Sequence, residues 1–121
     1  MLLADDHRVV LDGLASLIHE QSDIEVVGEA SNGLEAVDIA VKTRPVVVVV
    51  DVNMPVLNGF EAARRILAEL PGIRVIGLSM YEEPRMAELM RTLGAAAYLP
   101  KGSHAETLLA PIRAACPAVR P

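Results

Sequence analysis

Short apolar runs alternate with longer amphipathic segments along the whole chain. Each run has the length of a β-strand. The runs cover residues 1–4, 25–29, 46–50, 75–78 and 97–99. The third run is apolar at every position, which is typical of a central parallel strand buried on both faces. The pattern therefore predicts an α/β fold with a doubly wound, five-stranded parallel sheet, because right-handed crossovers leave few other arrangements.

The segments between the runs carry helix signals. Asn58 and Ser103 can cap helix N-termini, and Pro84 suits the first turn of a helix. One apolar stripe at helical spacing consists of Leu34, Val37, Ala40 and Val41. Each run is thus followed by a predicted helix, which completes the β-α alternation.

The last predicted helix, residues 103–116, contains a proline well past its first turn. Pro111 has no N–H donor, and its ring meets the carbonyl group of Thr107, which costs about 3 kcal/mol in a regular helix. We therefore expect this helix to be kinked or interrupted at Pro111.

Composition narrows the class of protein. The chain has 121 residues, of which 52% are hydrophobic and 22% charged, and this predicts one folded domain rather than a disordered segment. No apolar stretch approaches the roughly 18 residues of a membrane span, and acids follow the first run too early for a signal peptide. The single cysteine cannot form an intrachain disulfide, so we expect a cytoplasmic protein. We expect residues 1–116 to form the domain and residues 117–121 to begin a linker.

Charge argues against one class of partner. The net charge is −5, and the chain has only two tyrosines and one phenylalanine. A nucleic-acid surface needs basic residues for the phosphates and, for single strands, aromatic rings for the bases. We therefore expect this domain alone not to bind nucleic acid.

Polar side chains follow four of the runs at the point where each strand is predicted to end. Asp5 and Asp6 follow the first run, and Asp51 follows the third. Ser79 follows the fourth run, and Lys101 comes just after the fifth. In a parallel sheet these ends meet at one edge, where ligands bind. Each residue alone has a simpler explanation, such as a helix cap for Asp6 or a solvated charge for Lys101, but together they predict a site.

Three carboxylates at one edge repel one another unless a cation neutralises them. Oxygen ligands in an open site favour Mg²⁺. The histidines His7, His19 and His104 are scattered, and nothing indicates a cysteine–histidine zinc cluster. Asp51 follows the most apolar run and is the candidate nucleophile for a phosphoryl group. A lysine and a hydroxyl at the same edge would hold the added anion, so the chain resembles a switch more than an ordinary enzyme.

The same residues carry a family resemblance that extends over essentially the whole chain. The chain resembles the receiver domain of bacterial two-component response regulators, of the NarL/FixJ (LuxR-type) subfamily. The resemblance lies in Ala4-Asp5-Asp6-His7, Asp51-Val52-Asn53-Met54-Pro55, Leu78-Ser79-Met80-Tyr81 and Tyr98-Leu99-Pro100-Lys101-Gly102. It implies a flavodoxin-like receiver fold, with the strand order 2-1-3-4-5 that we predict.

The resemblance also implies a role for each site residue. Asp51 would accept the phosphoryl group from a sensor histidine kinase. Asp6 and Asp51 would bind Mg²⁺ or Mn²⁺ directly, Asp5 through water, and Asn53 through its backbone carbonyl.

On the phosphoryl side, the resemblance implies that Lys101 contacts the added group. Ser79 and Tyr98 would form the switch pair, in which the hydroxyl moves to the phosphate and the ring changes rotamer. Such receivers often form phosphorylation-dependent homodimers. They usually precede a DNA-binding helix-turn-helix domain, which we expect after residue 121.

Three other functions explain the residues less well. A haloacid-dehalogenase-type phosphatase needs a second aspartate two residues after the nucleophile, and Asn53 stands there. A flavin mononucleotide carrier needs a phosphate loop after the first strand, where Asp5 and Asp6 would repel phosphate. A receiver that serves only as a scaffold would not need the complete acidic set and the lysine.

Overall fold

The computed structural model describes residues 1–21, 24–52, 54, 56–79, 84–100 and 110–114. Strands and helices alternate from the first residues onward. The elements are β1 (Leu2–Ala4), α1 (Arg8–His19), β2 (Gly28–Ala30), α2 (Gly33–Thr43), β3 (Val47–Asp51), α3 (Gly59–Glu69), β4 (Arg74–Ser79), α4 (Pro84–Leu93) and β5 (Ala97–Pro100). Residues 110–114 are also helical. The predicted β-α alternation is confirmed.

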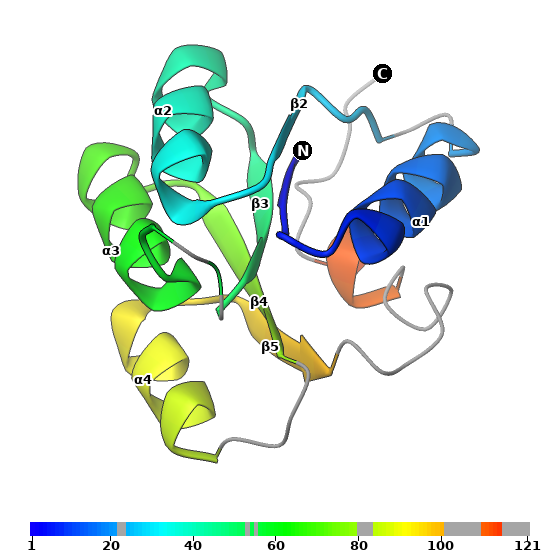
Figure 1. The fold of residues 1–121 in the computed structure, drawn as a ribbon. Coiled ribbons are helices and arrows are strands. Elements are labelled where there is room, and N and C mark those ends of the chain that lie inside the picture. The colour runs from blue at the N-terminus through cyan, green and yellow to red at the C-terminus, as the bar shows by residue number, and fades with distance from the viewer. Residues whose placement is uncertain (22–23, 53, 55, 80–83, 101–109, 115–121) are drawn as a thin grey trace.

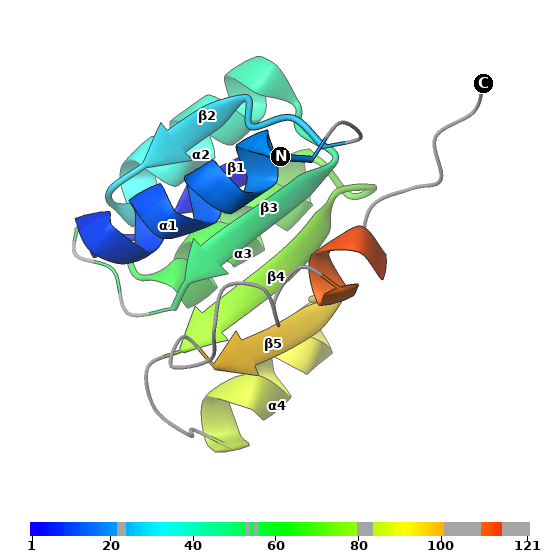
Figure 2. The same cartoon turned by 90° about the vertical axis from the view of Figure 1, so that its right-hand side faces the viewer.

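The strands form one parallel sheet in the order β2-β1-β3-β4-β5, as predicted (Figure 2). The first and third strands of the chain are therefore neighbours. Ala4 pairs with Val50, and Asp51 pairs with Leu78. Because every pair is parallel, the carboxyl ends of all strands reach the same edge of the sheet.

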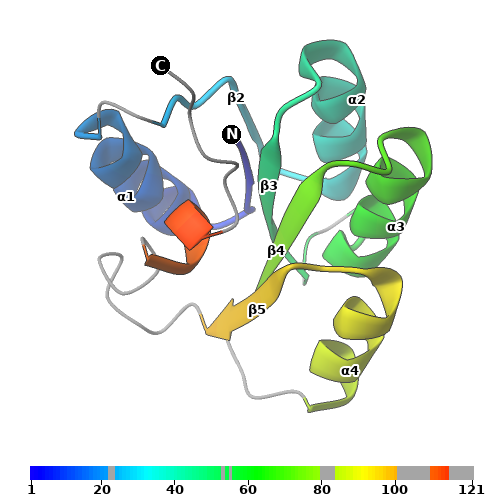
Figure 3. The ribbon, with the colours of Figure 1, turned by 180° about the vertical axis from the view of Figure 1, so that it is seen from behind.

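Helices cover both faces of the sheet. Figure 1 shows α2, α3 and α4 on one side and α1 with the segment 110–114 on the other, and Figure 3 shows the same layers from behind. The side chains of β3 alternate between two cores. Val48 and Val50 pack in the core under α2, α3 and α4, whereas Val47 and Val49 pack in the core under α1. Residues 47–50 of the third run are thus buried on both faces, as predicted, whereas Val46 precedes the strand and is 51% exposed.

The largest differences from the sequence prediction concern the second strand and the helix α2; the other strand boundaries shift by at most one residue. The second strand begins at Gly28, three residues later than expected, because β2 lies at the edge of the sheet and only β1 holds it. The predicted stripe on α2 is wrong in part. Leu34 and Val41 are exposed, and the buried positions are Gly33, Ala36 and Ala40. Small residues are buried there because α2 packs closely against its neighbours, and a Cβ on Gly33 would lie 1.8 Å from the carbonyl oxygen of Leu57.

Helix caps anchor the ends of α2 and α3 nearest the carboxyl edge of the sheet. Asn58 accepts a hydrogen bond from the backbone N–H of Glu61 at 2.8 Å, which confirms its predicted role. Asn32 does the same for Glu35 at 2.9 Å. Ser31 donates hydrogen bonds from its backbone N–H and its hydroxyl to the Glu35 carboxylate, and these lower the pKa of Glu35. The cap of α1 is His7, so the alternative of Asp6 as a helix cap is wrong.

Several predictions concern residues outside the described ranges. They include the cap at Ser103, the kink involving Thr107 and the linker 117–121. Pro111 itself lies in the helical segment 110–114. None of the helices that the structure describes is long and apolar enough for a membrane span.

Candidate phosphoacceptor and metal site

Two neighbouring strands bring three carboxylates together at the carboxyl edge of the sheet. Asp5 follows β1 directly, and Asp51 is the last residue of β3. Because Ala4 pairs with Val50, the residues that follow them, Asp5 and Asp51, lie side by side. The backbone N–H of Asp5 donates to the carbonyl oxygen of Ala30 at 3.0 Å, which extends the sheet to this residue. Strand register alone therefore places Asp5 next to Asp51.

The three carboxylates differ in their exposure. The side chains of Asp5 and Asp51 are 2% and 0% exposed, whereas that of Asp6 is 32% exposed. Buried carboxylates this close together need a cation or hydrogen-bond donors. Within the cluster, Asp6 is therefore the carboxylate most open to solvent.

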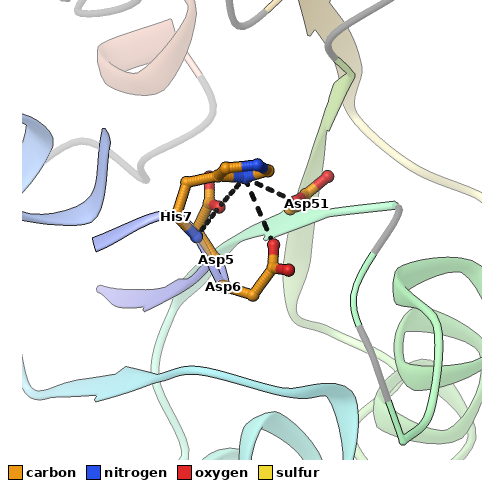
Figure 4. A group of neighbouring side chains, drawn as sticks. All are labelled: Asp5, Asp6, His7 and Asp51. Atoms are coloured by element: carbon orange, nitrogen blue, oxygen red, sulfur yellow. Dashed lines mark hydrogen bonds and ion pairs between the residues drawn. The ribbon is translucent and has the colours of Figure 1, made fainter. Parts of the chain in front are cut away.

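A histidine completes the cluster, and the sequence analysis did not anticipate it. Nδ1 of His7 lies 3.2 Å from Oδ1 of Asp5, 3.2 Å from Oδ1 of Asp6 and 3.7 Å from Oδ2 of Asp51 (Figure 4). The prediction that the histidines are scattered is wrong for His7, which lies against three carboxylates. Its position directly after two acids was the available signal, since the turn that begins α1 returns this residue to the end of β1.

The main chain around Asp51 is tightly packed. A Cβ on Gly59 would lie 2.0 Å from the carbonyl oxygen of Asp51 and 2.6 Å from Cα of Val52. The backbone N–H of Gly59 donates to the carbonyl oxygen of Val52 at 3.0 Å. The start of α3 is thus fixed against the end of β3, which holds the Asp51 backbone in place.

The two residues of the predicted switch pair, Ser79 and Tyr98, lie on β4 and β5. Ser79 is buried at the end of β4, one residue after the Leu78 that pairs with Asp51. Tyr98 lies on β5 beside Gly77. The Tyr98 hydroxyl oxygen is buried and has no hydrogen-bond partner among the described residues. A Cβ on Gly77 would lie 2.9 Å from Cδ1 of Tyr98, so the glycine leaves room for the ring.

Two predicted site residues, Asn53 and Lys101, lie outside the described residues. The other predicted residues Asp5, Asp6 and Asp51 form one cluster, and their ligand atoms and that of His7 all lie within 4.8 Å of one another. Carboxylate oxygens at this spacing suit a divalent cation such as Mg²⁺. A buried acceptor carboxylate beside such a cluster can take up a phosphoryl group.

Comparison with known proteins identifies the family of this chain. The family model of the response regulator receiver domain matches residues 1–113. The transcriptional regulatory protein LiaR of Bacillus subtilis is 40% identical over 115 residues, which cover 95% of this chain and 54% of LiaR. The chain thus spans about half the length of that relative.

Solved structures of response regulators are also similar to this chain. A LuxR-family response regulator from Aurantimonas sp. SI85-9A1 is 32% identical with a TM-score of 0.87, covering 93% of this chain and 81% of that one. The receiver domain of NarL from Mycobacterium tuberculosis is 30% identical with a TM-score of 0.85, covering 94% of this chain and 93% of that one. The chain belongs to the response regulator receiver domain family, and its relatives are regulators of the LuxR/NarL type.

Proposed function

We propose that this chain is a phosphorylation-activated signalling switch in which Asp51 accepts a phosphoryl group from a sensor histidine kinase. The observation that carries the proposal is the buried Asp51 carboxylate at the end of β3, grouped with Asp5 and Asp6. Family membership supports it, because phosphorylation and Mg²⁺ are typical of receiver domains.

In the proposed reaction a carboxylate oxygen of Asp51 attacks the phosphorus atom of a phosphohistidine. The new O–P bond makes an acyl phosphate as the N–P bond breaks, and the imidazole of the kinase keeps the electron pair and takes a proton from solvent. The tight packing of Gly59 supports this step, because it holds the acceptor in one position. The chain catalyses only this transfer onto itself and a slow dephosphorylation, so it is not a conventional enzyme.

The same cluster is proposed to bind Mg²⁺ or Mn²⁺. Asp6 and Asp51 would be direct ligands, Asp5 a ligand through water, and Asn53 a ligand through its backbone carbonyl. When bound, the cation neutralises the carboxylates and orients the phosphoryl oxygens. Lys101 would then contact the phosphoryl group.

Ser79 and Tyr98 are proposed to convert phosphorylation into a change of shape. The Ser79 hydroxyl would bind a phosphoryl oxygen, and the space that it leaves would change the packing of the Tyr98 ring. The buried Tyr98 hydroxyl oxygen supports this role, since it has no hydrogen-bond partner among the described residues and a change of rotamer can give it one.

An output domain outside this chain is proposed to carry out the response. The relatives are transcriptional regulators, and this chain spans about half of LiaR. Residues 117–121 would begin the linker to a DNA-binding helix-turn-helix domain, and phosphorylation would promote a homodimer. The net charge of −5 argues against DNA binding by this domain itself.

Acetyl phosphate with Mg²⁺ tests the phosphoacceptor. Intact-mass measurement should show one phosphoryl adduct on the wild-type chain, because the small donor replaces the kinase and releases acetate. The adduct should disappear in Asp51→Asn and when the metal is removed by a chelator. Asp38→Asn, an exposed position on α2, is the matched control and should keep the adduct. An adduct that persists in Asp51→Asn would show that the nucleophile is another residue.

A further inference from the structure

The acidic cluster contains one side chain that a magnesium site built from oxygen atoms does not need. Nδ1 of His7 lies 3.2 Å from carboxylate oxygens of both Asp5 and Asp6 and 3.7 Å from one of Asp51. In Figure 4, dashed lines join the His7 ring to each of the three carboxylates, and all three contacts come from Nδ1. The side chain is 47% exposed, so contact with these acids is not forced by burial.

The local backbone holds the imidazole in this position. The backbone N–H of His7 donates to Oδ1 of Asp5 at 2.8 Å, which closes a tight turn after β1. His7 is the N-cap residue of α1, yet its side chain makes no capping hydrogen bond. The ring is therefore not used by the helix and is directed at the cluster.

The four ligand atoms have the dimensions of a single coordination shell. The nitrogen of His7 and the oxygens of Asp5, Asp6 and Asp51 all lie within 4.8 Å of one another. In an octahedral shell with bonds of about 2.1 Å, adjacent ligands are about 3.0 Å apart and opposite ligands about 4.2 Å apart. The two distances of 3.2 Å match adjacent positions. Small side-chain movements would bring all four atoms onto one cation.

We propose that His7 is a metal ligand of this site and that it sets the metal selectivity. This inference rests on the proposed metal site of the acidic cluster. Neutral imidazole is a good ligand for Zn²⁺, Ni²⁺ and other late first-row ions, whereas Mg²⁺ prefers oxygen. With the proton on Nε2, the lone pair of Nδ1 is available to bind the cation. The carboxylates supply the negative charge that balances the cation. The site then favours late first-row divalent ions over Mg²⁺ more strongly than an all-oxygen site does.

Binding measurements with single metal ions test the selectivity. Dissociation constants for Mg²⁺ and Ni²⁺ are measured by calorimetry on the wild type, His7→Ala and His7→Gln, with folding checked by circular dichroism. Both variants should lose about tenfold or more in Ni²⁺ affinity, while Mg²⁺ affinity changes less than about twofold. His19→Ala, at the far end of α1, is the matched control and should bind both ions like the wild type.

A spectroscopic measurement separates direct ligation from an indirect effect. Zn²⁺ is diamagnetic, so the ¹⁵N shifts of the His7 ring can be followed by NMR during titration. Ligation predicts a large shift at Nδ1 that Mg²⁺ does not produce. An equal loss of affinity for Ni²⁺ and Mg²⁺ in His7→Ala would refute the inference, since His7 would then only orient the acids. A gain of affinity for both ions would also refute it, since His7 would then repel cations. If the wild type binds neither Mg²⁺ nor Ni²⁺, the proposed metal site itself fails.

Discussion

The two halves of the sheet hold their helices in different ways. On the half that contains Asp51, the proposed phosphoacceptor (called the acceptor half below), α3 buries Gly59, Ala62, Ala63 and Ile66. On the other half, the only buried residue of α4 is Met90, and a groove of about 410 Å³ that Tyr98 lines runs between α4 and β5. Helices with few buried contacts open more easily. The half that contains the proposed phosphoacceptor is therefore fixed, and the half proposed to respond is loosely anchored.

Two glycines show the same difference at the level of atoms. A Cβ on Gly59 would meet main-chain atoms of β3, the nearest at 2.0 Å. A Cβ on Gly77 would meet the Tyr98 ring at 2.9 Å and the terminal methyl of Met90 at 3.0 Å. Main-chain atoms of a central strand cannot yield, whereas side-chain ends can rotate. Main-chain packing therefore fixes the proposed acceptor site, whereas side-chain packing surrounds the residue proposed to respond.

The largest effect is expected from Gly59→Ala. Because the added methyl group overlaps the Asp51 backbone, the free energy of unfolding should fall by about 3 kcal/mol or more, measured by urea titration. Gly13→Ala, in α1 with nothing near its Cβ, should instead stabilise the protein by about 0.5–1 kcal/mol. A Gly59→Ala protein as stable as the wild type would show that the acceptor half is not fixed by this contact.

Met90→Ala should destabilise the protein by about 2–5 kcal/mol, because it removes a fully buried side chain. Native-state hydrogen exchange should show the loss mainly as faster opening of α4, with the amides of β1 and β3 less affected. Leu89→Ala, at an exposed neighbouring position, should cost much less. Equal loss of protection in β3 would mean that the two halves open together.

Gly77→Ala should cost less than Gly59→Ala, about 1–3 kcal/mol, because Tyr98 and Met90 can move aside. The Tyr98 ring should turn away from β4, and its NMR signals should shift before any phosphorylation. Phosphorylation of Asp51 should persist in this variant. Unchanged Tyr98 signals would show that the glycine does not control the ring.

Ser79→Ala should have the smallest effect on stability, about 0.5–1.5 kcal/mol, because it removes one buried hydroxyl. The proposed conformational response to phosphorylation should nevertheless become weaker. The acetyl phosphate adduct should still form, while the amide shifts of α4 and β5 on phosphorylation should become weaker. A full response of the amide shifts in this variant would show that Ser79 is not part of the proposed switch.

Local patterns in the sequence were enough to predict the architecture and part of the site. Strand length, the fully apolar third run and the polar residues at strand ends identify a parallel sheet with Asp5, Asp6 and Asp51 at one edge. These features are local because side-chain direction in a strand depends only on alternation, and strand ends depend on where polar residues begin. The cap at Asn58 was predictable for the same reason, since a helix cap contacts only residues of its own first turn.

Only the tertiary structure decided which groups are near one another in space. Nothing local in the sequence indicates that Gly33 and Gly59 face main-chain oxygens of other segments, or that Leu34 and Val41 on α2 lie outside the core. The position of His7 depends on the turn in which its backbone N–H donates to the Asp5 carboxylate. It also depends on β3, a strand far along the chain, which places Asp51 beside the imidazole. Periodicity reports which residues are buried in an element, whereas close approach and side-chain direction depend on what packs against it.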